Sequence, residues 1–219
     1  MQHRFFVKTQ KQQHVIQLKI LICAIFLNIV LGSVLYLLDA SFLIFVIISI
    51  TLSIIASFID VPSGIKSGNL IYYSPLLIGE AVKNKILKLH GGTLFDYYYV
   101  LNRRASYSER KRQVFKGYID GLLNLIEKYE TTPQNAIRIK ATSYIINTRT
   151  AQKMGLHKVK TDFLGAMIIY FNYFNLLCSL SLLNAKLTFP NINNVCSFEG
   201  DLNDLMRKKD YLLALKSRI

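Results

Sequence analysis

The sequence predicts an N-terminal transmembrane α-helical hairpin followed by a small helix-rich α/β cytosolic domain. Three observations predict this fold class. Residues 20–59 are dominated by apolar side chains and are interrupted by a charge only at Asp39. Lysine and arginine residues lie on both sides of this apolar segment. After it, helical and alternating apolar patterns follow one another over a length that suits one domain.

Residues 20–38 and 42–59 are predicted to be two membrane-spanning helices. A bilayer core is about 30 Å thick and is crossed by about 20 apolar helical residues. The whole segment is therefore twice too long for one span. Asp39 is a turn former, and Ser41 is a suitable N-cap for the second helix. Because a carboxylate inside a bilayer is costly, we place Asp39 at the far interface, in a tight turn.

The charge pattern predicts which side of the membrane each part occupies. Residues 1–19 contain four basic residues and no acidic residue, and further lysines follow the second span. Because lysine and arginine are retained on the cytoplasmic side, both termini of this multi-pass membrane protein are predicted to be cytoplasmic. A leader peptide cleaved near Gly32 and Ser33 is the alternative, but the apolar run continues past both residues. The predicted organisation is a basic cytoplasmic tail, a transmembrane hairpin, a linker and a cytosolic domain, at residues 1–19, 20–59, 60–73 and 74–219.

Small and polar residues recur every four positions in both predicted spans. They are Ala24, Asn28 and Gly32 in the first span, and Ser49, Ser53 and Ser57 in the second. Such stripes let helix backbones approach closely, and an asparagine can hydrogen-bond across the contact. Two interpretations stay open. Either the two helices of one hairpin pack on each other through these stripes, or several hairpins assemble into a homo-oligomer through the faces that remain.

The chain is strongly basic, with a formal net charge of +14. Basic residues next to a membrane favour anionic lipid headgroups, and each contributes about 1 kcal/mol near the surface. The residues expected to make these contacts follow the hairpin in two clusters: Lys83, Lys85, Lys88, Arg103 and Arg104. Nucleic acid is the competing partner, because its phosphates attract the same kind of surface. Anionic membrane lipids are the preferred partner, and direct nucleic-acid binding is the alternative.

The first part of the domain is predicted to be helical. Ser74 and Pro75 are a good helix start and Gly91 with Gly92 a good stop. This helix either lies along the membrane surface or is an ordinary domain helix. Residues 93–101 follow, with four aromatic side chains around one aspartate. Their consecutive tyrosines have high strand propensity, and we expect them to pack in the core or at the membrane interface rather than on bases.

The rest of the domain alternates between helix and strand. Residues 108–130 repeat apolar side chains every three or four positions and predict the clearest soluble helix. Residues 163–183 carry no charge and are predicted to be the central buried helix. A third span is the alternative, which the asparagine and serine side chains of this segment disfavour. Further elements are predicted as strands at 137–141 and 157–161, and as helices at 148–155 and 200–216.

No motif in the sequence points to a reaction. The histidines are not at metal-ligand spacing, the cysteines form no CxxC pair, and no phosphate-binding or nucleophile-elbow motif is present. We therefore predict no catalytic residues, no cofactor, no metal site and no enzyme activity. An enzyme with dispersed catalytic groups would need a convergent polar set, such as Asp96, Asp120, His157 and Asp162.

The spans at 20–38 and 42–59, followed by one small domain, resemble the transmembrane effectors of bacterial anti-phage defence, including the two-helix effector proteins encoded beside retrons. The resemblance is architectural and covers mainly residues 1–60. It implies a toxin-like inner-membrane effector of an abortive-infection system. A regulatory protein or ribonucleoprotein complex encoded nearby would keep it silent until infection is sensed, and it would then permeabilise the membrane. The alternatives are a membrane-anchored enzyme acting on lipid or envelope precursors, or a binding or immunity scaffold.

Overall fold

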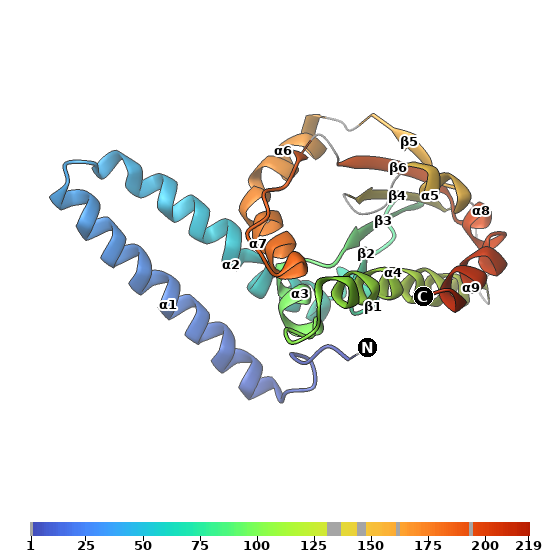
Figure 1. Ribbon diagram of the computed structural model, residues 1–219, viewed down its shortest axis with the longest axis horizontal. Helices are drawn as coiled ribbons and strands as arrows, with labels where there is room; N and C mark the ends of the chain where they lie inside the picture. Colours follow the sequence, from blue (N-terminus) through green and yellow to red (C-terminus); the bar gives the residue numbers. More distant parts are fainter. Residues whose placement is uncertain (1, 131–136, 144–147, 161–162, 193–194) are drawn as a thin grey trace.

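A hairpin of two long helices projects from an α/β domain in the computed structural model of the chain (Figure 1). The structure describes residues 2–130, 137–143, 148–160, 163–192 and 195–219. Two long apolar helices are followed by a six-stranded mixed sheet and several helices. The coarse fold predicted from the sequence is therefore confirmed.

The hairpin turn lies where the sequence predicts it. Thr9 begins the first helix through a capping box, in which Thr9 and Gln12 each accept a hydrogen bond from the other's backbone N–H. Asp39 has a φ of 54°, a left-handed conformation that aspartate tolerates in tight turns. The elements of the hairpin are α1 (Gln10–Leu37), the short 3₁₀ helix η1 (Ser41–Leu43) and α2 (Ile44–Lys66).

Turn-forming residues at the start of the predicted linker do not end the helix. α2 continues to Lys66 with Pro62 inside it. Proline has no backbone N–H, so the carbonyl of Phe58, four residues earlier, loses its usual helical partner. The side chain of Gln17 on α1 donates to this carbonyl, with an Nε2–O distance of 3.1 Å. The helix tolerates the proline because α1 supplies the missing donor.

The sheet has the strand order β1-β2-β3-β4-β6-β5, with β3 parallel to β4 and the other neighbours antiparallel. Leu87, Leu89 and Phe198 are at most 3% exposed on one face. Lys88, between the two leucines, points to the other face and pairs with Glu80. One face therefore packs on the core. The strands are β1 (Leu70–Ser74), β2 (Leu77–Glu80), β3 (Ile86–Gly91), β4 (Arg138–Ser143), β5 (His157–Val159) and β6 (Cys196–Asp201).

The helix predicted between Ser74 and Gly91 is wrong. β1 ends at Ser74, a turn containing Pro75 follows, and β2 and β3 occupy the rest of the segment. Asn84 and Lys85 have φ values of 52° and 62°, which suit a tight strand connection and do not fit a helix. The apolar residues of this segment match helical and strand spacing equally well, and the turn residues decide in favour of strands.

The helix predicted at residues 108–130 is confirmed as α4, which packs against β1, β2 and α9. Ile119, Leu125 and Ile126 of α4 are at most 2% exposed and lie in the main core. The strands predicted at 137–141 and 157–161 and the helix at 148–155 are confirmed as β4, β5 and α5. The bounds of the domain helices are α3 (Leu94–Val100), α4 (Tyr107–Glu130), α5 (Thr148–Lys153), α6 (Phe163–Phe171), α7 (Tyr173–Asn184), α8 (Leu202–Met206) and α9 (Lys209–Ser217).

Residues 93–101 form helix α3 despite their tyrosines. Thr93 and Asp96 make a capping box that begins the helix. Phe95 and Tyr97 are at most 1% exposed, so the predicted core packing is confirmed for these two aromatics, whereas Tyr98 is 38% exposed. A local cap and burial outweigh the strand propensity of the side chains.

Residues 163–183 do not form one central buried helix. They form α6 and α7, which meet at Asn172, and each is too short to cross a bilayer alone. α6 is exposed, since Ile168 is 61% and Phe171 is 72% accessible. The prediction of one helix at 200–216 is also wrong. Gly200 still belongs to β6, and two separate helices, α8 and α9, follow.

Candidate functional site at the base of the hairpin

The two hairpin helices are exposed along most of their length. Only 6% of the most apolar 18-residue stretch of α1 is buried, and 17% of that of α2. Phe26, Leu37 and Phe45 are between 67% and 81% exposed. Soluble proteins rarely expose a contiguous apolar surface of this size, and a core helix would be mostly buried. These helices are long and apolar enough to cross a membrane and lack the burial of core helices.

The predicted contact residues of α1 face α2. Asn28 Nδ2 donates to the carbonyl of Ala24 at 2.8 Å, and Asn28 Oδ1 accepts from Thr51 Oγ1 of α2 at 3.5 Å. Ala24 is 8% exposed. A Cβ at Gly32 would lie 4.0 Å from the side chain of Ile44, an ordinary van der Waals distance. This stripe therefore closes the hairpin against its own second helix.

The serine stripe of α2 faces α6 and α7 instead of α1. Ser53 Oγ donates to the carbonyl of Phe171 at 2.7 Å, and Ser57 Oγ accepts from Asn175 Nδ2 at 3.1 Å. Ser49 Oγ donates only within its own helix. The interpretation in which the two stripes pack on each other therefore does not hold for Ser53 and Ser57, whose partners follow more than a hundred residues later.

The N-terminal segment packs on the domain and is not a free tail. Phe5 is 1% exposed and lies against Phe95 and Tyr99. Arg4 donates from its backbone N–H to the carbonyl of Tyr99 at 3.4 Å, and from Nη2 to that of Tyr98 at 2.8 Å. The start of α1 and the end of α2 are therefore both held at the domain.

Asp96 joins this segment to α3. Its carboxylate is fully buried, and Oδ2 accepts from the backbone N–H and the hydroxyl of Thr93 at 2.7 and 2.8 Å. Oδ1 accepts from the hydroxyl of Tyr72 and lies 3.2 Å from His3 Nε2. Burial, and then the nearby Asp96 carboxylate, raise the pKa of Tyr72, so its hydroxyl stays protonated and donates. His3 and Asp96 are 93 residues apart, and no sequence pattern signals such a contact.

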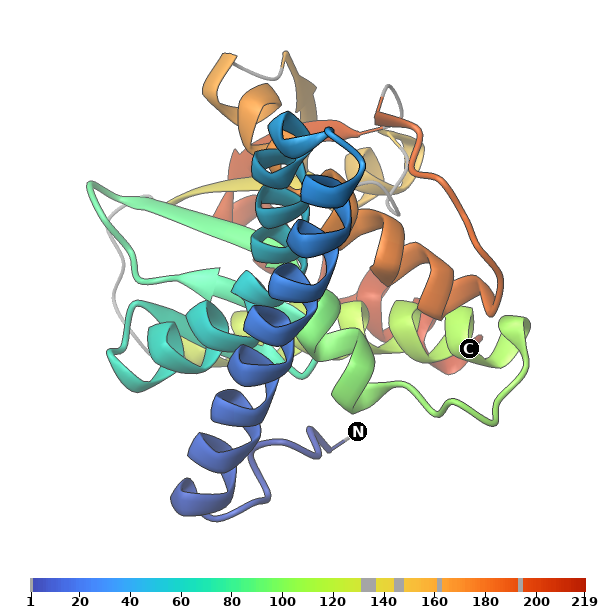
Figure 2. The same cartoon turned by 90° about the vertical axis from the view of Figure 1, so that its left-hand side faces the viewer.

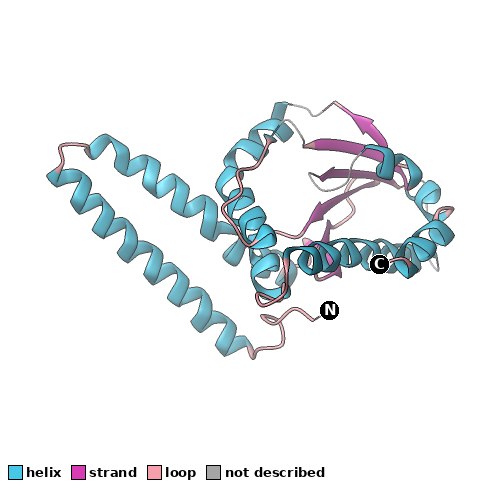
Figure 3. Cartoon of the chain, in the orientation of Figure 1, coloured by secondary structure: helices cyan, strands magenta, loops and turns pink. Residues whose placement is uncertain are grey.

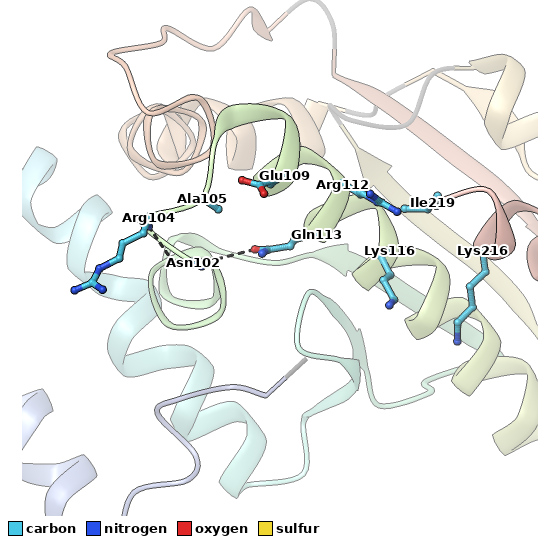
Figure 4. A pocket seen from close by; sticks show the side chains of 9 residues that line it. All are labelled: Asn102, Arg104, Ala105, Glu109, Arg112, Gln113, Lys116, Lys216 and Ile219. Carbon is cyan, nitrogen blue, oxygen red and sulfur yellow. Dashed lines mark hydrogen bonds between the residues drawn. The ribbon is translucent and has the colours of Figure 1, made fainter.

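Two shallow grooves with basic walls lie beside this N-terminal contact. The first has a volume of about 650 Å³ and is lined by Arg4, Lys8, Tyr98, Tyr99, Asn102, Arg103 and Arg104. The second has a volume of about 560 Å³ and shares Asn102 and Arg104 with the first. Figure 4 shows its other lining residues, with Lys116 of α4 and Lys216 of α9 pointing to the same side. Together they form one basic groove, defined by these residues.

The basic groove is suited to anionic groups. Its acidic lining residue, Glu109, is engaged in capping α4, and the backbone N–H of Ser106 lowers the pKa of Glu109. The guanidinium Cζ of Arg103 lies over the ring of Tyr98, 4.0 Å from the ring centroid, in a cation–π contact. Guanidinium and ammonium groups at this density bind phosphate oxygens through charge-assisted hydrogen bonds.

The five residues expected to contact headgroups do not lie together. Arg103 and Arg104 line the basic groove. Lys83 and Lys85 lie at the β2–β3 connection, and Lys88 lies in β3. This pair of strands projects to one side when the molecule is viewed along the hairpin (Figure 2). Lys88 is engaged with Glu80 at 3.4 Å. Although burial opposes it, hydrogen bonding to His90 and the charges nearby hold the pKa of Glu80 below its usual value.

The residues named for a dispersed active site occupy separate places. Asp96 is buried in the α3 cap, Asp120 pairs with Lys216 at 2.7 Å, and His157 is exposed on the edge strand β5. Asp162 lies outside the described residues. Among the residues that the structure describes, no three histidine, cysteine, aspartate or glutamate side chains come close enough to hold a metal ion.

Comparison with protein-family models, curated proteins and solved structures finds no match to this chain. The two hairpin helices stand apart from the strands and helices of the domain (Figure 3). The hairpin is apolar and exposed, its ends contact the domain, and the basic groove lies beside them.

Proposed function

We propose that this chain is a two-span inner-membrane protein that acts on the bilayer as a toxin-like effector. The observation that carries the proposal is the hairpin, whose apolar surface is exposed while both of its ends are held at the domain. Water does not solvate such a surface without aggregation, whereas a bilayer core does.

The hairpin has the length of two bilayer crossings. The charges that bound its two apolar intervals are Lys19 on α1, Asp39 at the turn and Asp60 on α2. At 1.5 Å per residue, each of the two intervals measures about 30 Å, which is the thickness of a bilayer core. Lys19 and Asp60 then lie at the interface on the domain side, and Asp39 lies at the opposite interface.

Orientation follows from charge. The basic groove and the basic N-terminal residues are on the domain side of the hairpin. Lysine and arginine are retained in the cytoplasm, so the domain and both termini are cytoplasmic in this proposal. Arg4, Lys8 and Arg103 would then meet the anionic headgroups of the cytoplasmic leaflet.

A single hairpin encloses no interior, so damage to the membrane requires assembly of several copies. Ser53 and Ser57 are already engaged by α6 and α7, which leaves Ser49 as the exposed small residue of that stripe. Small residues let membrane helices approach closely, and Ser49 therefore marks the face on which a second hairpin packs. In the proposed effector, a regulatory protein or ribonucleoprotein complex holds the domain and prevents this assembly.

Induced expression in a bacterium, followed by membrane potential and dye entry, tests this function. The wild-type chain made without its partner should depolarise the cell. Ser49→Leu should abolish depolarisation without lowering membrane insertion, because it fills the contact face. Ile48→Phe, an enlargement at an exposed α2 position about 100° around the helix from Ser49, is the control and should remain toxic.

Normal growth with an intact membrane would contradict the effector function and leave an anchored enzyme or a binding scaffold. Toxicity that survives Ser49→Leu would contradict assembly through this face. Toxicity lost equally in Ser49→Leu and Ile48→Phe would show that the serine face has no special role.

A further inference from the structure

We propose that α6 and the segment 185–192 form a third membrane-inserted element, which enters the leaflet next to the domain without crossing the bilayer. This inference rests on the proposed crossing of the membrane by the hairpin. It identifies acyl chains as the partner of a surface that the sequence analysis assigned to a buried core helix.

The surface is apolar and exposed. α6 presents Ile168, Tyr170 and Phe171 at 61%, 65% and 72% exposure, and the segment 185–192 presents Leu187 and Phe189 at 68% and 66%. Both parts lie on the side of the domain from which the hairpin projects, as the two perpendicular views agree (Figures 1 and 2). Both parts therefore present apolar side chains on the same side of the domain as the apolar hairpin.

The contact with α2 fixes the depth of α6. Ser53 donates to the carbonyl of Phe171, the last residue of α6. Ser53 precedes Asp60 by nearly two helical turns, so it lies about 10 Å nearer the hairpin tip. If Asp60 marks the polar interface, the end of α6 lies about 10 Å inside the acyl region. A soluble partner cannot reach that depth, and lipid is already there.

The polar groups at the break between α6 and α7 find partners within the protein. The break between α6 and α7 frees the Phe171 carbonyl, which accepts from Ser53. Asn172, at the break, donates from Nδ2 to the carbonyl of Ile168 at 2.8 Å. Non-helical backbone is tolerated at membrane depth only when its groups find such internal partners.

Charge agrees with this placement. Residues 163–192 contain no acidic residue. Lys158 and Lys160 precede α6, and Lys186 precedes the two exposed apolar side chains of segment 185–192. Lysines at the ends of an inserted element reach the headgroups with their ammonium groups while their stems stay apolar.

The absence of tryptophan from the chain gives a direct test, because a single introduced tryptophan is the only indole reporter. Phe171→Trp reports on α6, Phe26→Trp on α1 and Leu213→Trp on α9 at the far end of the domain. Each full-length variant is reconstituted into vesicles of neutral and anionic phospholipid. Emission is then quenched with acyl-brominated lipids or with aqueous acrylamide.

Phe171→Trp should have blue-shifted emission, be quenched by brominated lipid and be protected from acrylamide. Phe26→Trp, near the bilayer centre, should respond more to bromines deep in the chains than Phe171→Trp does. Leu213→Trp should respond only to acrylamide. Ile168→Trp, one turn earlier on α6, repeats the test in case one substitution prevents folding.

Quenching of Phe26→Trp by brominated lipid without quenching of Phe171→Trp and Ile168→Trp would overturn this inference and leave the hairpin crossing intact. If brominated lipid quenches none of the tryptophan variants, the proposed crossing of the membrane by the hairpin is overturned as well. Protection of α6 from acrylamide without quenching by brominated lipid would show that a second protein copy, not lipid, covers it.

Discussion

Asp96 organises the junction between the N-terminal segment and the domain. One buried carboxylate caps α3 through Thr93, accepts from Tyr72 and contacts His3. A buried carboxylate is costly unless its lone pairs are filled, and here both oxygens are occupied. The position therefore couples a local helix start to a long-range contact, and both depend on one side chain.

Asp96→Asn should lower the free energy of unfolding by about 1–3 kcal/mol, because an amide N–H would face groups that themselves donate. It should also release the N-terminal segment, so that trypsin cleaves after Arg4 or Lys8 at lower protease concentration. Denaturant unfolding in detergent micelles measures the first effect, and limited proteolysis measures the second.

The matched control is Asp201→Asn, at an exposed residue that precedes α8 without a side-chain capping bond. This variant should be as stable and as protease-resistant as the wild type. Equal stability of the Asp96 and Asp201 variants would contradict the organising role of Asp96.

At the scale of elements, two glycines set how closely α4 approaches the sheet. A Cβ at Gly117 would lie 2.9 Å from Leu76 Cδ1, and one at Gly121 would lie 2.6 Å from Leu77 Cβ. The β1–β2 connection therefore fits against α4 at two positions that have no side chain. Leu76 is fully buried there, at the centre of the main core.

Gly121→Ala should destabilise the domain by about 1–3 kcal/mol, because the added methyl overpacks against a Cβ atom that cannot rotate away. The expected sign is opposite to the usual one, because replacing glycine by alanine inside an exposed helix normally stabilises the helix by about 1 kcal/mol. Glu127→Ala, on the exposed side of α4, is the control and should change stability little. Denaturant unfolding that finds Gly121→Ala more stable than wild type would contradict the close approach.

Elements whose structure is determined by neighbouring residues in the sequence could be predicted, and the others could not. The hairpin could be predicted because span length, the turn at Asp39 and the flanking charges are all encoded within 60 consecutive residues. α4 could be predicted because its apolar period is sustained over 24 residues. β2 and β3 were misassigned as helix because short apolar segments fit both periods, and only Asn84 and Lys85 in their turn distinguish them. β1 lies in the segment that was predicted to be a linker.

The candidate site depends on contacts that no local pattern contains. The serines of α2 were singled out by their spacing, yet their partners on α6 and α7 come from 118 residues away. The docking of Phe5 and His3 on α3 likewise joins the two ends of the first hundred residues. Arg103 and Arg104 were identified by charge, but the groove they line is formed only when α3, α4 and the N-terminal segment meet.

At the scale of the whole molecule, one geometry connects these parts. The hairpin projects from the domain with its apolar surface exposed, and the segment before α1 and the end of α2 both contact the domain (Figure 1). The basic groove lies beside those ends, and α6 contacts α2 partway along its length. A membrane between Asp39 and the domain accounts for all three features at once.

Cysteine accessibility in intact cells tests this central claim most directly. In a variant with Cys23, Cys178 and Cys196 replaced by serine, Ser41→Cys places a thiol at the exposed hairpin tip, and Ser217→Cys places one on α9. A membrane-impermeant maleimide should label Ser41→Cys from outside the inner membrane, and Ser217→Cys only after the membrane is permeabilised. Labelling of both thiols only after permeabilisation, or of Ser217→Cys in intact cells, would contradict a hairpin that crosses the membrane with its domain inside.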